Sequence, residues 1–230
     1  ILNLAKKHNL KVIEDNAQAI GCEYTFSNGD KKYTGTMGDI GTTSFYPTKN
    51  LGAYGDGGAI FTNNDKLVKK IKMIANHGES KRYHHDIIGI NSRLDSIQAE
   101  VLNVKLKYLS DYNKARNQMA ENYNNAFSSV EELQIPELNK NSSHVFHQYT
   151  LKVQNGKRDD LMKYLDQNGI ETRVYYPIPV HKQKAFSKYS NISLNNTDEL
   201  VTSCLSLPIH TEIENSFQEY IIDNVLNFFK

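Results

Sequence analysis

The sequence predicts an α/β fold with a second, smaller domain, and three observations support this prediction. Short apolar runs alternate with helical patterns at the start of the chain, as they do in a βαβ unit. An apolar stripe at three- and four-residue spacing predicts one long helix over residues 93–125. After Pro136 the pattern changes to short elements separated by polar loops, glycine and proline. We therefore expect a large α/β domain over residues 1–125 and a small α+β domain over residues 126–230.

Each expected element follows from a local pattern of apolar residues and its flanking breakers. The large domain should contain helix 1–10, strand 11–15, strand 40–45, strand 59–63, helix 66–78, a loop at 79–91 and helix 93–125. The small domain should contain strand 144–153, helix 157–168, strand 170–176, helices near 182–189 and 198–202, and a closing helix from about 214.

Composition restricts the class of protein. A formal net charge of +1 argues against a nucleic-acid partner, and no apolar run is long enough to span a membrane. Cys22 and Cys204 are far apart and form no CxxC spacing, which favours a reducing compartment. No signal peptide opens the chain, so we expect a cytoplasmic protein. The chain begins without Met inside a helical pattern, which is typical of a fragment.

Polar residues after the first two strands suit a carbanion-stabilising cofactor. Such a cofactor needs a lysine for the Schiff base, a carboxylate against its ring nitrogen and a phosphate cradle. Asp15 follows the first strand and Lys49 follows the second, so both side chains are expected to face one crevice. Ser44 and the glycines after Lys49 offer hydroxyl and backbone donors. Taken singly, Asp15 can cap a helix, Ser44 can be a strand serine, and Lys49 can be a solvated charge.

Four segments, in order, resemble the signatures of the DegT/StrS sugar aminotransferases: VIEDNAQAIG, GDIGTTSFYPTKNLGAYGDGGAIFTNN, GINSRLDSIQAEVLNVKLKYL and YYPIPVHKQKAF. The resemblance implies the three-layer large domain of a fold-type I transferase that depends on pyridoxal 5′-phosphate (PLP), with a small C-terminal α+β domain. It also implies that the first third of the family's chain is missing here. The likeness is strongest to the subgroup that aminates dTDP-linked 3-keto-6-deoxyhexoses.

The resemblance assigns catalytic and cofactor-binding roles to five residues. Lys49 resembles the Schiff-base lysine, which also moves the proton, and Asp15 resembles the carboxylate that keeps the ring nitrogen protonated. Gln18 matches a residue near the ring hydroxyl, and Ser44 matches a phosphate ligand. Asn91 matches an asparagine that reaches the cofactor phosphate of a neighbouring subunit, which implies a homodimer with shared active sites. Gln18 as a surface amide and Asn91 as the N-cap of the long helix remain alternatives.

Further residues are candidates for substrate binding: Tyr46, Lys81, Arg82, Tyr83, His84 and His181. The basic residues of 81–82 suit a diphosphate, and the neighbouring tyrosine or histidine suits the sugar. A solvated loop is the alternative; a metal site is disfavoured, because adjacent histidines rarely ligate one ion. The tyrosine at 46 can instead be a packing residue. His8, His144, His147 and His210 are interpreted as structural.

The resemblance implies transfer of an amino group from L-glutamate to the keto carbon of a nucleotide-linked 6-deoxy sugar, in amino-sugar and surface-polysaccharide (O-antigen) biosynthesis. Three alternatives remain. The related dehydratases carry histidine in place of the lysine, and Lys49 argues against them. The other two are a non-catalytic fragment that dimerises or regulates, and a carbohydrate-binding protein on an α/β scaffold.

Overall fold

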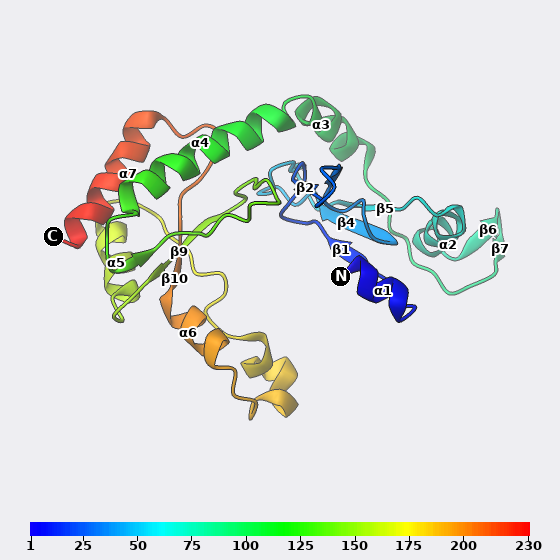
Figure 1. Ribbon diagram of the computed structural model, residues 1–230. Helices are drawn as coiled ribbons and strands as arrows, with labels where there is room; N and C mark the ends of the chain where they lie inside the picture. The colour runs from blue at the N-terminus through cyan, green and yellow to red at the C-terminus, as the bar shows by residue number, and fades with distance from the viewer. The chain divides into compact units, whose positions relative to one another are not determined.

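The computed structural model describes all 230 residues, which form two compact units (Figure 1). The first unit comprises Ile1–Lys114 and Asn139–His147, and the second comprises Ala115–Leu138 and Gln148–Lys230. The boundary between the units, after Lys114, falls inside a helix, and residues 139–147 return to the first unit. The domain boundary at residue 125 stays a prediction.

The first unit contains the strands and helices on which the predicted cofactor residues lie. In chain order its elements are α1 (Leu2–Lys7), β1 (Ile13–Asp15), β2 (Glu23–Thr25), β3 (Lys31–Tyr33), β4 (Ile40–Ser44), β5 (Gly58–Phe61), α2 (Asp65–Ala75), β6 (Glu79–Lys81), β7 (His84–His85) and α3 (Ser96–Leu106). Helix α4 (Leu109–Phe127) begins in this unit and ends in the second.

The central sheet of the first unit has the strand order β1-β4-β5 (Figure 1). Strands β1 and β4 are parallel, with Asp15 opposite Thr42. Strands β4 and β5 are antiparallel, with Ser44 opposite Gly58. Because β1 and β4 are parallel neighbours, their carboxyl ends meet at one edge of the sheet. The segments that follow Asp15 and Ser44 therefore leave the sheet at the same edge.

The two faces of this sheet differ in exposure. Side chains alternate between faces along a strand, so Ile13, Asp15, Thr42 and Ile60 share one face. On this face Ile13 is 66% exposed and Ile60 is 53% exposed. Thr43, on the opposite face, is buried. The face that carries Asp15 is thus open to solvent in this chain.

A small apolar core underlies the segment after β4. Its buried members are Phe45, Leu51, Ala53 and Leu102, with Ile20, Ala59 and Leu109 packed against them. Since three of the buried residues come from 45–53, the apolar residues of this short segment fix its backbone against α3.

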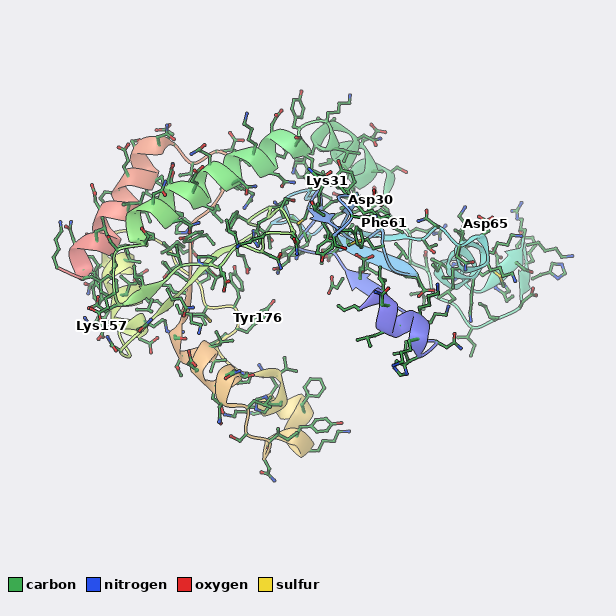
Figure 2. All side chains as sticks on the ribbon, in the orientation of Figure 1. Asp30, Lys31, Phe61, Asp65, Lys157 and Tyr176 are labelled. Atoms are coloured by element: carbon green, nitrogen blue, oxygen red, sulfur yellow. The ribbon has the colours of Figure 1, made fainter.

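Helix α2 begins with a side-chain cap. The Asn64 side chain accepts hydrogen bonds from the backbone N–H groups of Lys66 at 3.0 Å and Leu67 at 3.3 Å. Asp65, labelled in Figure 2, opens the helix and places a negative charge at its N-terminus.

The single helix predicted over residues 93–125 is wrong, because the chain forms the separate helices α3 and α4. Helix α3 starts after Asp95, whose carboxylate accepts from the N–H of Ile97 at 2.8 Å. At the break the N–H of Tyr108 bonds to the carbonyl of Lys105 at 2.9 Å, a tighter turn than the α-helical one. The apolar stripe continues across the break, so periodicity did not reveal it.

Residues 79–91, expected as a loop, contain a β-hairpin formed by β6 and β7. Glu79 pairs with His85 and Lys81 with His84. Two glycines cross at the base of this hairpin. A Cβ on Gly78 would lie 1.7 Å from the carbonyl oxygen of Ile87, and a Cβ on Gly89 would lie 2.1 Å from the nitrogen of Gly78. Only glycine fits at either position.

The second unit has its own sheet and helices. Besides the end of α4 it contains β8 (Leu133–Gln134), β9 (Tyr149–Val153), α5 (Arg158–Gln167), the 3₁₀ helices η1 (Val180–Lys182) and η2 (Lys184–Tyr189), α6 (Asn195–Ser203), β10 (Cys204–Leu207) and α7 (Asn215–Phe228). The antiparallel sheet has the order β10-β9-β8. The fully buried side chains of the second unit include Tyr123, Phe127, Tyr149, Leu151, Val153, Leu161, Leu165, Ile170, Leu205, Ile221 and Val225. Lys157, labelled in Figure 2, precedes α5 and pairs with Glu132 at 3.0 Å.

Two strands predicted for the second half are shorter in the structure. Of residues 144–153 only the last five form β9, because residues 144–147 belong to the first unit. Of residues 170–176 only Arg173 pairs, in an isolated bridge with Ser206. The helix expected near 182–189 is a pair of 3₁₀ helices. No helix of the structure is both long enough and apolar enough to cross a membrane.

Candidate active site

Lys49 lies on a tight loop, residues 45–53, which we call the lysine loop. The loop is closed at its ends by a hydrogen bond from the N–H of Ala53 to the carbonyl of Phe45 at 2.8 Å. Inside it, the N–H of Lys49 bonds to the carbonyl of Tyr46 at 2.9 Å. A Cβ on Gly52 would lie 2.4 Å from the carbonyl oxygen of Pro47, so the loop can close this tightly only with glycine there.

Helix α3 holds the far end of the lysine loop. The Lys105 ammonium donates to the carbonyl of Gly52 at 2.8 Å and lies 4.9 Å from the ring centre of Tyr54. The Gln98 side chain accepts from the N–H of Tyr54 at 2.7 Å. These contacts, together with the buried Leu51 and Ala53, give the loop a fixed backbone on which Lys49 is presented.

The Lys49 side chain is half-buried and its ammonium has neither an ion-pair nor a hydrogen-bond partner. No carboxylate holds this amine, so its nitrogen is available to bond to an aldehyde carbon.

Asp15 ends β1 on the same sheet face as Thr42 and Ser44. One carboxylate oxygen accepts from the N–H of Ala17 at 3.0 Å, and the other has no hydrogen-bond partner. The alternative that Asp15 caps a helix is wrong, because turns and not a helix follow it. The side chain is exposed and keeps one oxygen available for a donor from outside the chain.

The remaining cofactor candidates lie near these two segments. Ser44 ends β4, and its hydroxyl oxygen accepts from the N–H of Tyr46 at 3.2 Å, which leaves its proton free to donate. Gln18 is exposed in the turn after Asp15. Tyr46 is 50% exposed, so it is not a core packing residue. These groups fit a phosphorylated aldehyde with a basic ring nitrogen. The lysine amine suits the aldehyde, the free carboxylate oxygen suits the ring N–H, and the serine hydroxyl suits the phosphate.

Two residues beside Asp15 hold its strand and were not singled out from the sequence. The Glu14 carboxylate accepts from the backbone N–H groups of Gly35, Met37 and Gly38 at 2.8, 2.6 and 2.5 Å. Buried Asn16 donates its N–H to Thr42 at 2.8 Å. In the sequence, only their position on either side of Asp15, an acid that ends a strand, could have indicated this role.

The β6–β7 hairpin presents four of the candidate substrate residues to solvent. Lys81, Arg82, Tyr83 and His84 are all exposed, and the Arg82 guanidinium lies 5.0 Å from the Tyr83 ring centre. The turn is held by Glu79, whose carboxylate accepts from the N–H of Tyr83 at 3.0 Å. This bond, with smaller contributions from His85 and Asn76, holds the pKa of Glu79 below its usual value. The structure contains no cluster of three or more His, Cys, Asp or Glu side chains that could hold a metal ion.

Asn91 follows the hairpin and does not cap a helix. It bridges to Asn76, and its side-chain oxygen accepts from the Arg93 guanidinium at 2.8 Å. The N-cap of α3 is Asp95. The capping alternative for Asn91 is therefore wrong, and the exposed amide nitrogen remains available.

His181 lies in the second unit, in η1. It is half-buried, and its Nε2 atom is enclosed without a hydrogen-bond partner. Nearby Asp198 is ion-paired with Lys182, which is the main reason that the pKa of Asp198 is lowered. In the first unit, His144 accepts from the N–H of Phe146 at 3.0 Å, and burial lowers its pKa, as suits a structural residue.

Known proteins share both the sequence and the fold of this chain. A "Pleiotropic regulatory protein" of Geobacillus stearothermophilus is 42% identical over 234 residues, covering 100% of this chain and 61% of its own length. The dTDP-3-amino-3,6-dideoxy-alpha-D-galactopyranose transaminase of Aneurinibacillus thermoaerophilus is 40% identical over 226 residues, covering 96% and 59%. This chain thus spans about three fifths of the length of these relatives.

A solved structure agrees with the sequence relatives. Bacillus subtilis NtdA, crystallised with bound cofactor PMP, matches with a TM-score of 0.86 and 33% identity, over 99% of this chain and 52% of that one. The fold is thus that of the fold-type I aminotransferases, as predicted. A profile of the DegT/DnrJ/EryC1/StrS aminotransferase family matches residues 1–226, and the chain belongs to this family.

Proposed function

We propose that the complete protein containing this chain is a PLP-dependent aminotransferase. It would transfer an amino group from L-glutamate to the keto carbon of a nucleotide-diphosphate-linked 6-deoxy keto-sugar, with dTDP-3-keto-6-deoxyhexose as the expected substrate. The observation that carries this proposal is Lys49: a half-buried amine without an ionic partner, on a rigid loop that leaves the sheet at the same edge as Asp15. The transaminase activity of a relative 40% identical to this chain supports it.

The chain's own residues divide the work of holding PLP. When bound, the cofactor supplies the electron sink for the transfer. Lys49 would hold its aldehyde carbon through Nζ, and Asp15 would accept a hydrogen bond from the ring N–H and keep that nitrogen protonated. Ser44 would donate its hydroxyl proton to the phosphate, and Gln18 would contact the ring hydroxyl. Asn91 would reach the phosphate in the neighbouring subunit of a homodimer.

Proton movement and substrate binding are assigned to separate groups. A free Lys49 amine accepts a proton from the substrate carbon and returns it, which is general acid–base catalysis by a positioned group. Lys81 and Arg82 would bind the diphosphate, because two exposed cations on one hairpin match its charge. Tyr83 and His84 would contact the sugar, Tyr46 would line the pocket, and His181 would bind substrate. The product would enter amino-sugar and surface-polysaccharide biosynthesis in the cytoplasm.

The decisive test is cofactor binding by the complete protein. On addition of PLP we expect an absorbance band near the edge of the visible range that Lys49→Ala abolishes. Lys69→Ala, at an exposed lysine of α2, is the matched control and should keep the band. A complete protein without the band would disprove the aminotransferase proposal and favour a non-catalytic or carbohydrate-binding module. Mass spectrometry of keto-sugar nucleotides incubated with glutamate and enzyme would then identify the substrate.

A further inference from the structure

We propose that Asn50 and Asn113 form a buried amide pair that positions Lys49, an inference that rests on the proposed function. Asn50 directly follows Lys49 on the lysine loop, and Asn113 lies on the part of α4 that belongs to the first unit. They are 8% and 9% exposed. The Asn50 amide donates to the Asn113 side-chain oxygen at 2.8 Å and to the carbonyl of Val145 at 2.8 Å.

The hydrogen bonds fix the orientation of both amides. The Asn113 amide nitrogen donates to the carbonyl of Ile20 at 3.1 Å, so the Asn113 oxygen must face Asn50 as an acceptor. Asn50 then faces two acceptors, the Asn113 oxygen and the Val145 carbonyl, and must present its NH₂ group to both. Neither amide can be flipped without placing two acceptors against each other.

The orientation leaves one buried group without a partner. The Asn50 side-chain oxygen is enclosed and accepts no hydrogen bond. A buried acceptor in this state is destabilising, and such groups are rare in folded proteins. An apolar residue of similar size would avoid this cost but could not hold the loop. Asparagine at position 50 is explained by the two hydrogen bonds that its amide donates, which hold the loop, and not by its packing.

The pair connects the two segments that carry the proposed catalytic groups. Ile20 lies in the second of two consecutive turns that follow Asp15, and Asn50 is adjacent to Lys49. Gly21 makes the connection possible: its φ is +83°, and a Cβ there would lie 2.7 Å from the Asn113 amide nitrogen. A chain of hydrogen bonds therefore runs from the lysine loop through Asn50 and Asn113 to the turn after Asp15. It fixes the spacing between the amine and the carboxylate.

The test measures the reactivity of Lys49 in folded protein, separately from turnover. The complete protein is treated with PLP and then with sodium borohydride, and mass spectrometry gives the trapping rate at Lys49 relative to exposed Lys69. Asn113→Asp keeps the acceptor for Asn50 but replaces the donor to Ile20 with a second acceptor. We expect this ratio to fall about tenfold or more, since misplacement of about 1 Å can cost as much as 100-fold. Asn125→Asp, an exposed position of the same helix, is the control.

The outcomes separate this inference from the proposed function. A wild-type protein that shows no preference for Lys49 over Lys69 contradicts the proposed function itself. A wild type that prefers Lys49, with Asn113→Asp giving the same ratio while only its melting temperature falls, overturns the positioning role alone. If Asn113→Asp does not fold, Asn113→Ser and Asn50→Ser are measured in the same way, and an unchanged ratio in the folded fraction of these variants is equally decisive.

Discussion

The two sheets of the molecule differ in how completely they are buried. In the second unit the side chains of β10 are all buried, and those of β9 alternate between buried and partly buried. In the first unit β1 and β5 carry the large apolar side chains of Ile13 and Ile60, and both are exposed. The second unit thus has a core of its own, whereas the sheet that bears Asp15 leaves the face with Ile13 and Ile60 uncovered. Stability and the proposed chemistry therefore depend on different regions.

The largest expected effect is the difference in free energy of unfolding between a substitution in the buried sheet and one in the exposed sheet. Leu205→Ala in β10 removes a fully buried side chain, so we expect a loss of about 2–5 kcal/mol in the free energy of unfolding. Ile60→Ala in β5 should change it by about 0.5 kcal/mol or less, because the side chain is already exposed. Urea unfolding of both variants measures this. Equal losses would show that the β5 face is covered in solution and would break the comparison.

Alkaline pH should destabilise the second unit first. Tyr123 and Tyr149 are fully buried there, and burial raises the pKa of both phenols. The unfolded chain loses these protons above pH ~10 while the folded unit keeps them, so the folded state binds more protons and stability falls as pH rises. The expected slope is about 1.4 kcal/mol per pH unit for each tyrosine.

Urea unfolding on either side of this pH range gives the slope, and Tyr149→Phe should halve it. This variant also loses the hydrogen bond from the phenol to Asn124 at 2.7 Å, so the slope and not the absolute stability is compared. A slope that Tyr149→Phe leaves unchanged would assign the alkaline transition to other groups.

An effect smaller than that of Leu205→Ala is expected at the cap of α2, in the first unit. Asn64→Ala removes the acceptor for two backbone N–H groups and should cost about 1 kcal/mol. Asn63→Ala, one residue earlier and also exposed, makes no such bonds and serves as the control. Hydrogen exchange of the α2 amides should increase only in the Asn64 variant. Similar exchange in both variants would mean that other contacts of α2, and not the cap, stabilise this helix.

Local patterns predicted most of the elements, and they were wrong where distant contacts decide the structure. The spacing of apolar residues and the polar or glycine residues that flank them were sufficient for β1, β4, α2 and α7. The break between α3 and α4 contains neither glycine nor proline, so nothing in the apolar stripe marks it. The hairpin after α2 depends on the Glu79 carboxylate, which holds Tyr83 at a φ of 70°. Polar residues in a tight hairpin give no strand pattern, and that segment reads as a loop.

The candidate site was predictable in part for the same reason. Asp15 and Ser44 are the last residues of strands, and Lys49 lies in the loop that follows the second strand, so the chain order itself indicates the sheet edge. The roles given to them stay predictions. Asn113 lies far from Lys49 in the sequence, and only the folded chain brings it to Asn50. Lys105 belongs to a helix in which lysines usually face solvent, so its bond to the lysine loop was equally hidden.

The glycine crossing at the base of the β6–β7 hairpin has a consequence for how the protein can diverge. Gly78 and Gly89 admit no side chain, so this part of the hairpin cannot vary without rebuilding the backbone. The tip, Lys81 to His84, makes few contacts and faces solvent, so its residues can be exchanged at little cost to folding. Proteins that share this base can therefore acquire different tips while the rest of the chain stays the same, and under the proposed function such changes would alter which acceptor molecule is preferred.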